Sequence, residues 1–350
     1  MSAAQQQPVP ARALRIGILS SARIARSFVQ AVRPSARVAV SAVASRDQRK
    51  AEAFAAQLNI PRAFGSYEQL LADPDIDAIY NPLPNSLHAV WSIRALRAGK
   101  HVLCEKPLSV GAAEARAMFD AARAAGVHLV EGYPYLAQPQ TLKLRELLAA
   151  GTIGKVRLIQ ASFGFVPTNP GDIRFDPALG GGALMDLGTY CVSLIRMVAQ
   201  ERPLRVNATA RWSAGGAGGS VDRTLAATLE FGGGLLAQAT CSFDSCLHRQ
   251  ALIAGSGGTI QTTFLNHTSV SAPGSLKLRV GFDTNAVDSV VETAAANGFL
   301  AEAESFAALI HEGPAHWNGA TPEESIDIAL TVEAILQSAR ERRAIDIAAT

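Results

Sequence analysis

The sequence predicts an α/β protein, in which a doubly wound parallel sheet of the Rossmann type precedes an α+β domain with a largely antiparallel, open sheet. In the first third, short β-rich runs alternate with longer helical patterns, which is typical of a parallel sheet covered by helices. After about residue 135, strand pairs joined by Gly-rich turns take over. At roughly 150 residues per domain, 350 residues suggest two domains. We place these at 1–132 and 133–350, with 1–13 disordered.

The first domain contains successive strand–helix units. Apolar runs rich in Val and Ile indicate strands, and longer amphipathic stretches indicate helices. In chain order, we expect a strand at 14–20, a helix at 24–32, a strand at 38–44, a helix at 48–58, a strand at 78–80, a helix around 87–98, a strand at 101–104, a helix at 112–125 and a strand at 127–130. Gly99 and Gly126 stand where C-terminal helix caps belong.

The second domain begins with one helix and continues with hairpins. The segment 224–243 (TLAATLEF, GGG, LLAQATCSF) predicts strand, turn and strand, and 251–264 repeats that arrangement. The remaining expected elements are a helix at 141–150, a hairpin tip at 214–220 and helices around 300–311 and 323–342. We expect the final helix to pack back on the first domain.

Charge and composition exclude several classes of function. The 32 Lys and Arg nearly balance the 30 Asp and Glu, so a net charge of +2 gives no general attraction to nucleic acid or an anionic membrane. Residues 1–13 lack the apolar core of a signal peptide, and no uninterrupted apolar run approaches the ~18 residues of a membrane helix. We therefore expect a cytoplasmic protein whose function resides in a pocket for a small molecule.

The four cysteines are too few for a disulfide scaffold, and we expect buried free thiols. Only Cys241 and Cys246 are close in sequence. The segment CSFDSCLH could hold a metal in principle, but it lacks a second ligand pair with zinc-site spacing. We predict no metal site.

The turn after the first strand is a candidate dinucleotide-binding loop. Ser20, Ala22 and Ala25 occupy the three positions where such a turn usually has the glycines of G-x-G-x-x-G. Small side chains still let a diphosphate approach the backbone at a helix N-terminus, whose N–H groups favour anions. The expected contacts are Ser20, Ser21, Ala22, Arg23 and Ile24. The alternative interpretation is an ordinary strand-to-helix turn.

The end of the second strand favours NADP over NAD, although NAD stays possible. Ser45 and Arg46 offer a hydroxyl and a guanidinium to a 2′-phosphate, and Arg49 or Lys50 could add a second cation. Alternatively, these cations only solvate the start of a helix. Asp47 leaves a further alternative, because a shift of one residue would make it the acceptor for the ribose hydroxyls of NAD.

Four motifs follow one another along the chain: 16–20 (IGILS), 82–88 (PLPNSLH), 104–108 (CEKPL) and 180–190 (GGGALMDLGTY). Together, in this order, they resemble the glucose-fructose oxidoreductase, inositol dehydrogenase and MocA (Gfo/Idh/MocA) family. Tyr190 stands where inositol dehydrogenases have His. The sequence is therefore most similar to the branch with dihydrodiol dehydrogenase, NADP-dependent xylose dehydrogenase and glucose-fructose oxidoreductase.

The resemblance implies catalytic roles for Lys106, Asp186 and Tyr190, and the chemistry of these groups agrees. Oxidising a secondary alcohol requires a group that removes the hydroxyl proton while hydride leaves. A Lys106 cation would stabilise an alkoxide and lower the pKa of a nearby Tyr190, which would move the proton. Asp186 lies one helical turn before Tyr190 and would bind a second hydroxyl or orient the relay. The alternatives are a first-turn helix acid for Asp186 and a half-buried structural aromatic for Tyr190.

Other positions of the resemblance supply candidate binding residues. Pro82, Leu83, Asn85 and His88 would border the nicotinamide. Glu105 would fix the strand end or contact a ribose, and Arg174 would contact cofactor or substrate. Tyr133, Tyr135 and Gln138 would form the floor of the substrate pocket, although Gln138 departs from the His common in that stretch. The resemblance also makes a cis Lys106–Pro107 bond possible, which the sequence leaves open.

Together these features predict an NADP-dependent oxidoreductase that transfers hydride to or from a secondary alcohol or carbonyl of a sugar, polyol or diol. One alternative is a glycosidase or lyase that keeps its dinucleotide bound and uses transient oxidation. Another is a non-catalytic dinucleotide sensor, against which the retained Lys106, Asp186 and Tyr190 argue. The open face of the antiparallel sheet suggests a homodimer or homotetramer.

Overall fold

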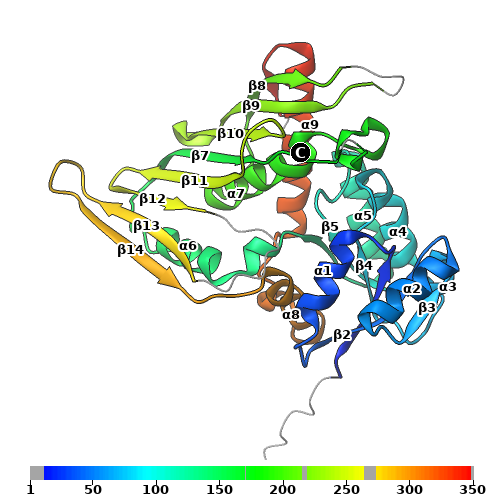
Figure 1. Ribbon diagram of the computed structural model, residues 1–350. Helices are drawn as coiled ribbons and strands as arrows, with labels where there is room; N and C mark the ends of the chain where they lie inside the picture. Colours follow the sequence, from blue (N-terminus) through cyan, green and yellow to red (C-terminus); the bar gives the residue numbers. More distant parts are fainter. Residues whose placement is uncertain (1–11, 170, 215–218, 264–272, 348–350) are drawn as a thin grey trace, which may run out of the picture.

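The structure is a computed structural model that describes residues 12–169, 171–214, 219–263 and 273–347. The expected disorder at the N-terminus and most of the expected hairpin tip at 214–220 fall outside these residues. Two sheets dominate the molecule, and helices pack on and between them (Figure 1).

The first sheet confirms the Rossmann prediction. Its six strands pair in the order β3-β2-β1-β4-β5-β6, and every pair is parallel. The strands are β1 (Leu14–Leu19), β2 (Val38–Ala44), β3 (Arg62–Phe64), β4 (Ala78–Asn81), β5 (His101–Glu105) and β6 (Leu129–Gly132). The helices are α1 (Arg23–Val32), α2 (Gln48–Leu58), α3 (Tyr67–Leu71), α4 (His88–Arg97) and α5 (Ala112–Ala125). The strand order reverses between β1 and β4, which places a ligand crevice at their carboxyl ends.

The second sheet is mixed but largely antiparallel, as expected. Its order is β14-β13-β12-β11-β7-β10-β9-β8-β15, and among these neighbours only β7 and β10 run parallel in the described residues. The strands are β7 (Val156–Gly164), β8 (Arg205–Trp212), β9 (Asp222–Glu230), β10 (Leu236–Ser242), β11 (His248–Gly255), β12 (Gly258–Thr262), β13 (Gly274–Val280), β14 (Val287–Thr293) and β15 (Ile345–Asp346). The helices are α6 (Pro139–Ala149), α7 (Thr189–Ala199), α8 (Gly298–Glu312) and α9 (Pro322–Glu341).

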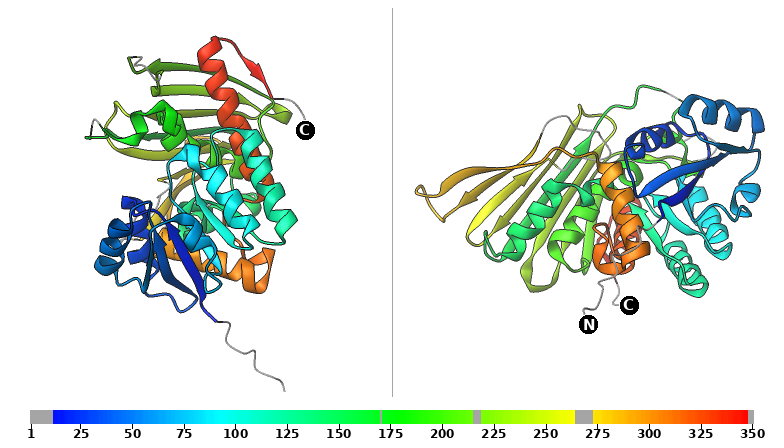
Figure 2. Two further views of the ribbon diagram at one scale, coloured as in Figure 1. Left: turned by 90° about the vertical axis from the view of Figure 1, so that its right-hand side faces the viewer. Right: turned by 90° about the horizontal axis from the view of Figure 1, so that it is seen from below.

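Helix α8 belongs to the core of the first domain, although it lies far along the chain. Phe299 and Phe306 are buried in the same apolar cluster as Phe28 and Tyr80. The Phe28 ring stacks on Tyr80 at 4.0 Å between centroids and meets the edge of Phe299 at 5.7 Å. Figure 2 shows α8 beside the first domain. A boundary at residue 132 therefore separates the two sheets correctly. However, it assigns α8 to the second domain, although α8 packs in the core of the first.

Helix α9 lies between the two domains. It packs on α5 of the first domain and on α7 and β8 of the second (Figure 1). A capping box formed by Thr321 and Glu324 starts it. Asp327 of α9 accepts a hydrogen bond from Arg196 Nε of α7 at 2.8 Å, and both side chains are buried. This ion pair fixes α9 against the second domain.

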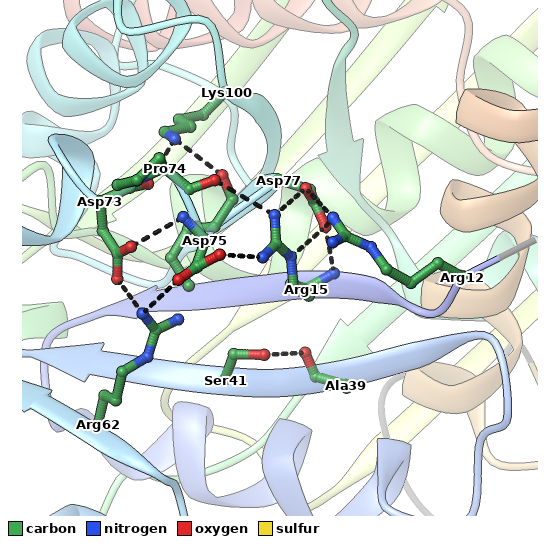
Figure 3. A network of polar contacts seen from close by, with 11 residues as sticks. Arg12, Arg15, Ala39, Ser41, Arg62, Asp73, Pro74, Asp75, Asp77 and Lys100 are labelled. Carbon is green, nitrogen blue, oxygen red and sulfur yellow. Dashed lines mark hydrogen bonds and ion pairs between the residues drawn. The ribbon is translucent and has the colours of Figure 1, made fainter.

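A charged network holds the amino end of the parallel sheet (Figure 3). Arg15 of β1 donates from Nε to Asp77, just before β4, at 3.0 Å. Lys100 donates to the carbonyl oxygens of Asp73 and Ile76 at 2.7 and 2.8 Å. These bonds are made at the amino end of the sheet. The ligand crevice lies at the opposite, carboxyl end and is not occupied by this network.

One helical segment of the second domain, Pro177–Ala199, is long and apolar enough to cross a membrane by length and composition. However, 72% of its most apolar window is buried inside the protein. It contributes α7 and the turn before it to the apolar core beneath the second sheet.

We expect Asp327→Ala to lower the free energy of unfolding by about 3 kcal/mol, because it leaves the Arg196 charge buried without this partner. Urea denaturation of both proteins measures the difference. Asp346→Ala is the control. It breaks the exposed pair with Arg205, at 3.5 Å, and should cost less than about 1 kcal/mol. Equal losses in the two variants would contradict the role assigned to Asp327.

Candidate active site

A cavity of about 410 Å³ lies where the carboxyl ends of β4 and β5 face the second domain. This volume is in the range of small-molecule sites. Both domains contribute to its walls. Predicted site residues that line it are Arg23, Ile24, Pro82, Leu83, Asn85, His88, Glu105, Lys106, Arg174, Asp186 and Tyr190.

Lys106, Asp186 and Arg174 form one ion-pair network in this cavity. Lys106 Nζ donates to Oδ1 and to the carbonyl oxygen of Asp186, both at 2.8 Å. Arg174 Nε donates to Oδ2 of Asp186 at 2.5 Å, and its Nη1 donates to Asp172. Burial raises the pKa of Asp186, but the two cations outweigh it and lower the pKa to about 2. Asp186 is therefore a carboxylate at neutral pH.

Asp186 lies in a π-helical turn, Leu184–Gly188, that leads directly into α7. The sequence predicted a continuous helix that would place Asp186 and Tyr190 on one face. With the π-turn, Asp186 and Tyr190 still lie near one another, because Lys106 contacts both. The Lys106 Nζ that donates to Asp186 lies 4.9 Å from the centroid of the Tyr190 ring. Such turns are frequent at functional sites.

The predicted lowering of the Tyr190 pKa by Lys106 is wrong. Burial raises the pKa of Tyr190 well above 10, and the carboxyl groups of Glu105, Asp186 and Glu302 raise it further. Lys106 lies over the face of the ring, and its charge is already shared with Asp186. Among the described residues, the Tyr190 hydroxyl is buried without a hydrogen-bond partner. Tyr190 is therefore a neutral phenol at neutral pH.

The N-terminus of α1 forms the cofactor side of the cavity. Ser20 has a positive φ of 76°, at the position of the first fingerprint glycine, and its Oγ accepts a bond from the Ala22 N–H. Ala22 precedes α1 and gives it no side-chain cap. The first N–H groups of α1 can therefore bind a diphosphate, and the residues at this turn fit a dinucleotide.

The residues predicted for the 2′-phosphate lie together at the end of β2. Ser45 is buried, whereas Arg46 and Arg49 are exposed. Asp47 caps α2, since Oδ1 accepts from the N–H groups of Arg49 and Lys50. Because Asp47 already caps α2, it is a poorer candidate for binding the ribose hydroxyls of NAD. The arrangement favours the interpretation in which Arg46 and Arg49 bind a 2′-phosphate.

Asn85, His88 and Glu105 are held by specific bonds at the cavity wall. Asn85 Nδ2 donates to the Gly180 carbonyl at 2.8 Å, which joins the domains. The two ring nitrogens of His88 lie 2.8 and 2.7 Å from the carbonyl oxygens of Pro107 and Leu83, and burial lowers its pKa to about 4. Glu105 accepts from the Tyr80 hydroxyl at 2.7 Å, which fixes the strand end.

Tyr133, Tyr135 and Gln138 do not line the cavity, which corrects their assignment as its floor. All three are buried behind it. The Tyr133 hydroxyl bonds with Thr189 Oγ1, and the Tyr135 hydroxyl with Ser193 Oγ at 2.8 Å. Their rings lie 5.5 and 6.0 Å from that of Tyr190, so they pack against Tyr190 instead of touching the contents of the cavity.

The far wall of the cavity was not predicted from the sequence. This wall contains Phe163 of β7 and Phe165 just after it, together with Leu247 just before β11 and Arg249 in β11. Strand pairing sets Arg249 opposite Phe163. The alternation within one strand shows which side chains share a face, but it does not reveal which strands are neighbours.

Among the described residues, no group of three or more His, Cys, Asp or Glu side chains could hold a metal ion. Cys104, Cys191 and Cys241 are buried free thiols, and Cys246 is an exposed one. The pair Cys241 and Cys246 is thus split between core and surface.

The comparisons with protein families decide the identity of the fold. Residues 14–133 match the model described as "Oxidoreductase family, NAD-binding Rossmann fold", and residues 141–261 match "GFO/IDH/MocA C-terminal domain". The chain belongs to the Gfo/Idh/MocA family. It is therefore an oxidoreductase with a Rossmann domain of the NAD-binding type, as the sequence resemblance implied.

Individual relatives agree with this assignment. The D-xylose 1-dehydrogenase (NADP(+)) 2 of Haloferax volcanii is 36% identical, over 95% of this chain and 100% of the relative. The trans-1,2-dihydrobenzene-1,2-diol dehydrogenase of Mus musculus is 40% identical, over 71% of this chain and 74% of the relative. The aldose-aldose oxidoreductase from Caulobacter crescentus, crystallised with glycerol, has 26% identity and a TM-score of 0.86, covering 96% of this chain and 100% of that structure.

Glu131 of β6 supports the loop that carries Lys106. Its Oε1 accepts the N–H of Leu108 at 2.8 Å. Burial raises the pKa of Glu131 to about 7, against the opposing effect of the Leu108 bond. Over the range from its ordinary value of 4.5 to about 7, the folded protein keeps a proton that the unfolded chain releases. Rising pH therefore reduces stability across that window.

We expect Glu131→Gln to remove this pH dependence, because Gln keeps an acceptor for Leu108 and cannot ionise. Between pH 4.5 and 7, the variant should lose roughly 3 kcal/mol less stability than the unchanged protein. Chemical denaturation at a series of pH values measures this difference. Glu68→Gln, at an exposed pair with Arg94, is the control and should keep the original slope. An unchanged slope in Glu131→Gln would show that Glu131 ionises normally in the fold.

Proposed function

We propose that this protein is an NADP-dependent dehydrogenase or reductase that moves hydride between the nicotinamide and a secondary alcohol or carbonyl of a sugar, polyol or diol. One observation carries the proposal: Lys106, Asp186 and Tyr190 meet in a single cavity beside the uncapped N-terminus of α1. The dehydrogenase names of the similar proteins from Haloferax volcanii and Mus musculus support the substrate class.

Lys106 would stabilise negative charge on the reacting oxygen. An ammonium group has three N–H donors, and Lys106 directs two hydrogen bonds to Asp186. One donor is thus left for a substrate hydroxyl or carbonyl oxygen. Asp186 fixes the direction of the ammonium group, while its second oxygen is held by Arg174. This preorganised cation lowers the barrier to an alkoxide.

Tyr190 would exchange the proton. Because its pKa lies well above 10, the phenol is protonated before substrate binds and can donate to a developing alkoxide in the reduction direction. In the oxidation direction, Tyr190 would first lose its own proton to water in the cavity, and the phenolate would then accept the hydroxyl proton while the Lys106 cation stabilises the alkoxide. When bound, the nicotinamide supplies or accepts the hydride.

NADP is the proposed cofactor. Ser45, Arg46 and Arg49 would hold the 2′-phosphate, and the turn Ser20–Ile24 the diphosphate. Pro82, Leu83, Asn85 and His88 would border the nicotinamide. The similar Haloferax volcanii enzyme is named for NADP(+).

We also propose that the protein is an oligomer and that it is located in the cytoplasm. Helices α6 and α7 pack on one face of the second sheet, and the other face carries a hollow of about 570 Å³ lined by polar side chains such as Gln160, Gln238 and Lys277. This face would pair with a second copy of the chain in a homodimer or homotetramer. The four free thiols suit a reducing compartment.

We expect Lys106→Ala to lower turnover about 10³-fold, because the reacting oxygen loses its cation. NADPH formation with a panel of aldoses, polyols and diols measures turnover, and a fluorescence titration measures NADPH binding, which should persist. Lys143→Ala, at an exposed pair with Glu146, is the control for loss of one Lys. Unchanged turnover would remove Lys106 from the mechanism, and product without stoichiometric NADPH would favour the lyase alternative.

We expect Arg46→Asp to weaken NADPH binding about 10- to 100-fold and to leave NADH binding nearly unchanged, because only NADPH carries the 2′-phosphate. Dissociation constants for the two nucleotides measure the preference. Arg97→Asp, exposed on α4 of the same domain, applies the same charge change away from the site. If the ratio of the NADPH and NADH dissociation constants is the same before and after the substitution, Arg46 does not bind the 2′-phosphate.

A further inference from the structure

Arg249 places a second-domain cation in the cavity close to the reacting groups. Its guanidinium carbon lies 5.9 Å from the centroid of the Phe163 ring. That ring is 5.6 Å from the ring of Tyr190, over which Lys106 lies. Leu247, two residues before Arg249, is 66% exposed and also lines the cavity. The Arg249 guanidinium is therefore one aromatic ring away from Tyr190.

The proposed cofactor contacts do not account for this guanidinium. The diphosphate and nicotinamide contacts come from the first domain, at α1 and after β4 and β5. The 2′-phosphate residues Arg46 and Arg49 follow β2 and are not among the cavity residues. Arg249 belongs to β11, next to β7 in the second sheet. It therefore faces the part of the cavity left for substrate.

Arg249 is one of the four Arg and Lys side chains that line the cavity in the described residues, with Arg23, Lys106 and Arg174. Lys106 and Arg174 are bonded to Asp186. Burial lowers the pKa of Arg174, but Asp186 and Asp172 outweigh it and the pKa is raised. Burial lowers the pKa of Arg249, and Tyr190 opposes this without reversing it. Because a guanidinium keeps its proton near neutral pH, an anionic ligand group would be stabilised beside it.

We propose that Arg249 recognises an anionic group on the substrate, so that the preferred substrates are acidic carbohydrates that carry a carboxylate or a phosphate away from the reacting carbon. This inference rests on the proposed function, and it names the substrate class. A guanidinium fork matches both anions, with two parallel N–H···O bonds. The neutral part of the sugar would lie against Phe163 and Tyr190, and the reacting hydroxyl would lie at Lys106.

Matched sugars test the preference. NADPH formation is measured with D-glucose, D-glucuronate and D-glucose 6-phosphate, and with D-galactose and D-galacturonate. We expect kcat/KM to be about 10- to 100-fold higher for the acidic member of at least one pair, mainly through KM. The uronate and the phosphate distinguish the two anions. Equal or lower values for every acidic sugar overturn the inference and leave the proposed hydride transfer intact. Absence of NADPH formation with every sugar, polyol and diol overturns the proposed function itself.

Variants assign the preference to Arg249. Arg249→Met should lower kcat/KM for the acidic sugar about 10-fold or more relative to the neutral one, and Arg249→Lys should keep part of the advantage. Arg223→Met is the control, because Arg223 pairs with Asp244 outside the cavity, and it should retain the preference. Proportional losses for acidic and neutral sugars in Arg249→Met would overturn the role in recognition and indicate a structural one.

Discussion

The ion pair between Lys106 and Asp186 is the contact on which the site depends. Lys106 follows a strand of the parallel sheet, and Asp186 lies in a π-turn of the other domain. The bond between them therefore fixes the relative position of the domains at the place where the cavity opens. It also balances charge, since two cations share one carboxylate. Without this balance, the Lys106 ammonium and the Arg174 guanidinium would repel each other inside a partly buried space.

Burial, reinforced by three nearby carboxyl groups, explains why the Tyr190 phenol is neutral. Glu105, Asp186 and Glu302 all raise the pKa of Tyr190, and they come from a strand, a π-turn and α8. Burial raises the pKa of Glu302 well above its usual range, and that of Glu105 as well. Asp186, by contrast, keeps a pKa of about 2 beside Lys106 and Arg174.

The sequence allowed prediction of the parts whose signals are local. Alternating strands and helices identified the parallel sheet, and Gly-rich turns identified two hairpins of the second sheet. The short strand β3 and the short helix α3 escaped notice, because three and five residues carry little periodicity. Lys106, Asp186 and Tyr190 were found through motifs. Arg249 and the burial of Tyr133 were not, since both follow from which strands and helices become neighbours.

The late position of α8 bears on how the chain matures during synthesis. Phe28, near the start, packs against Phe299, near the end. While the chain grows from its N-terminus, the apolar surface of α1 and β4 has no α8 to cover it until about nine-tenths of the protein has been made. The nucleotide domain is thus translated first but can complete its own interior only after strands β7 to β14 of the second sheet have been synthesised. Its folding is tied to the emergence of that sheet from the ribosome.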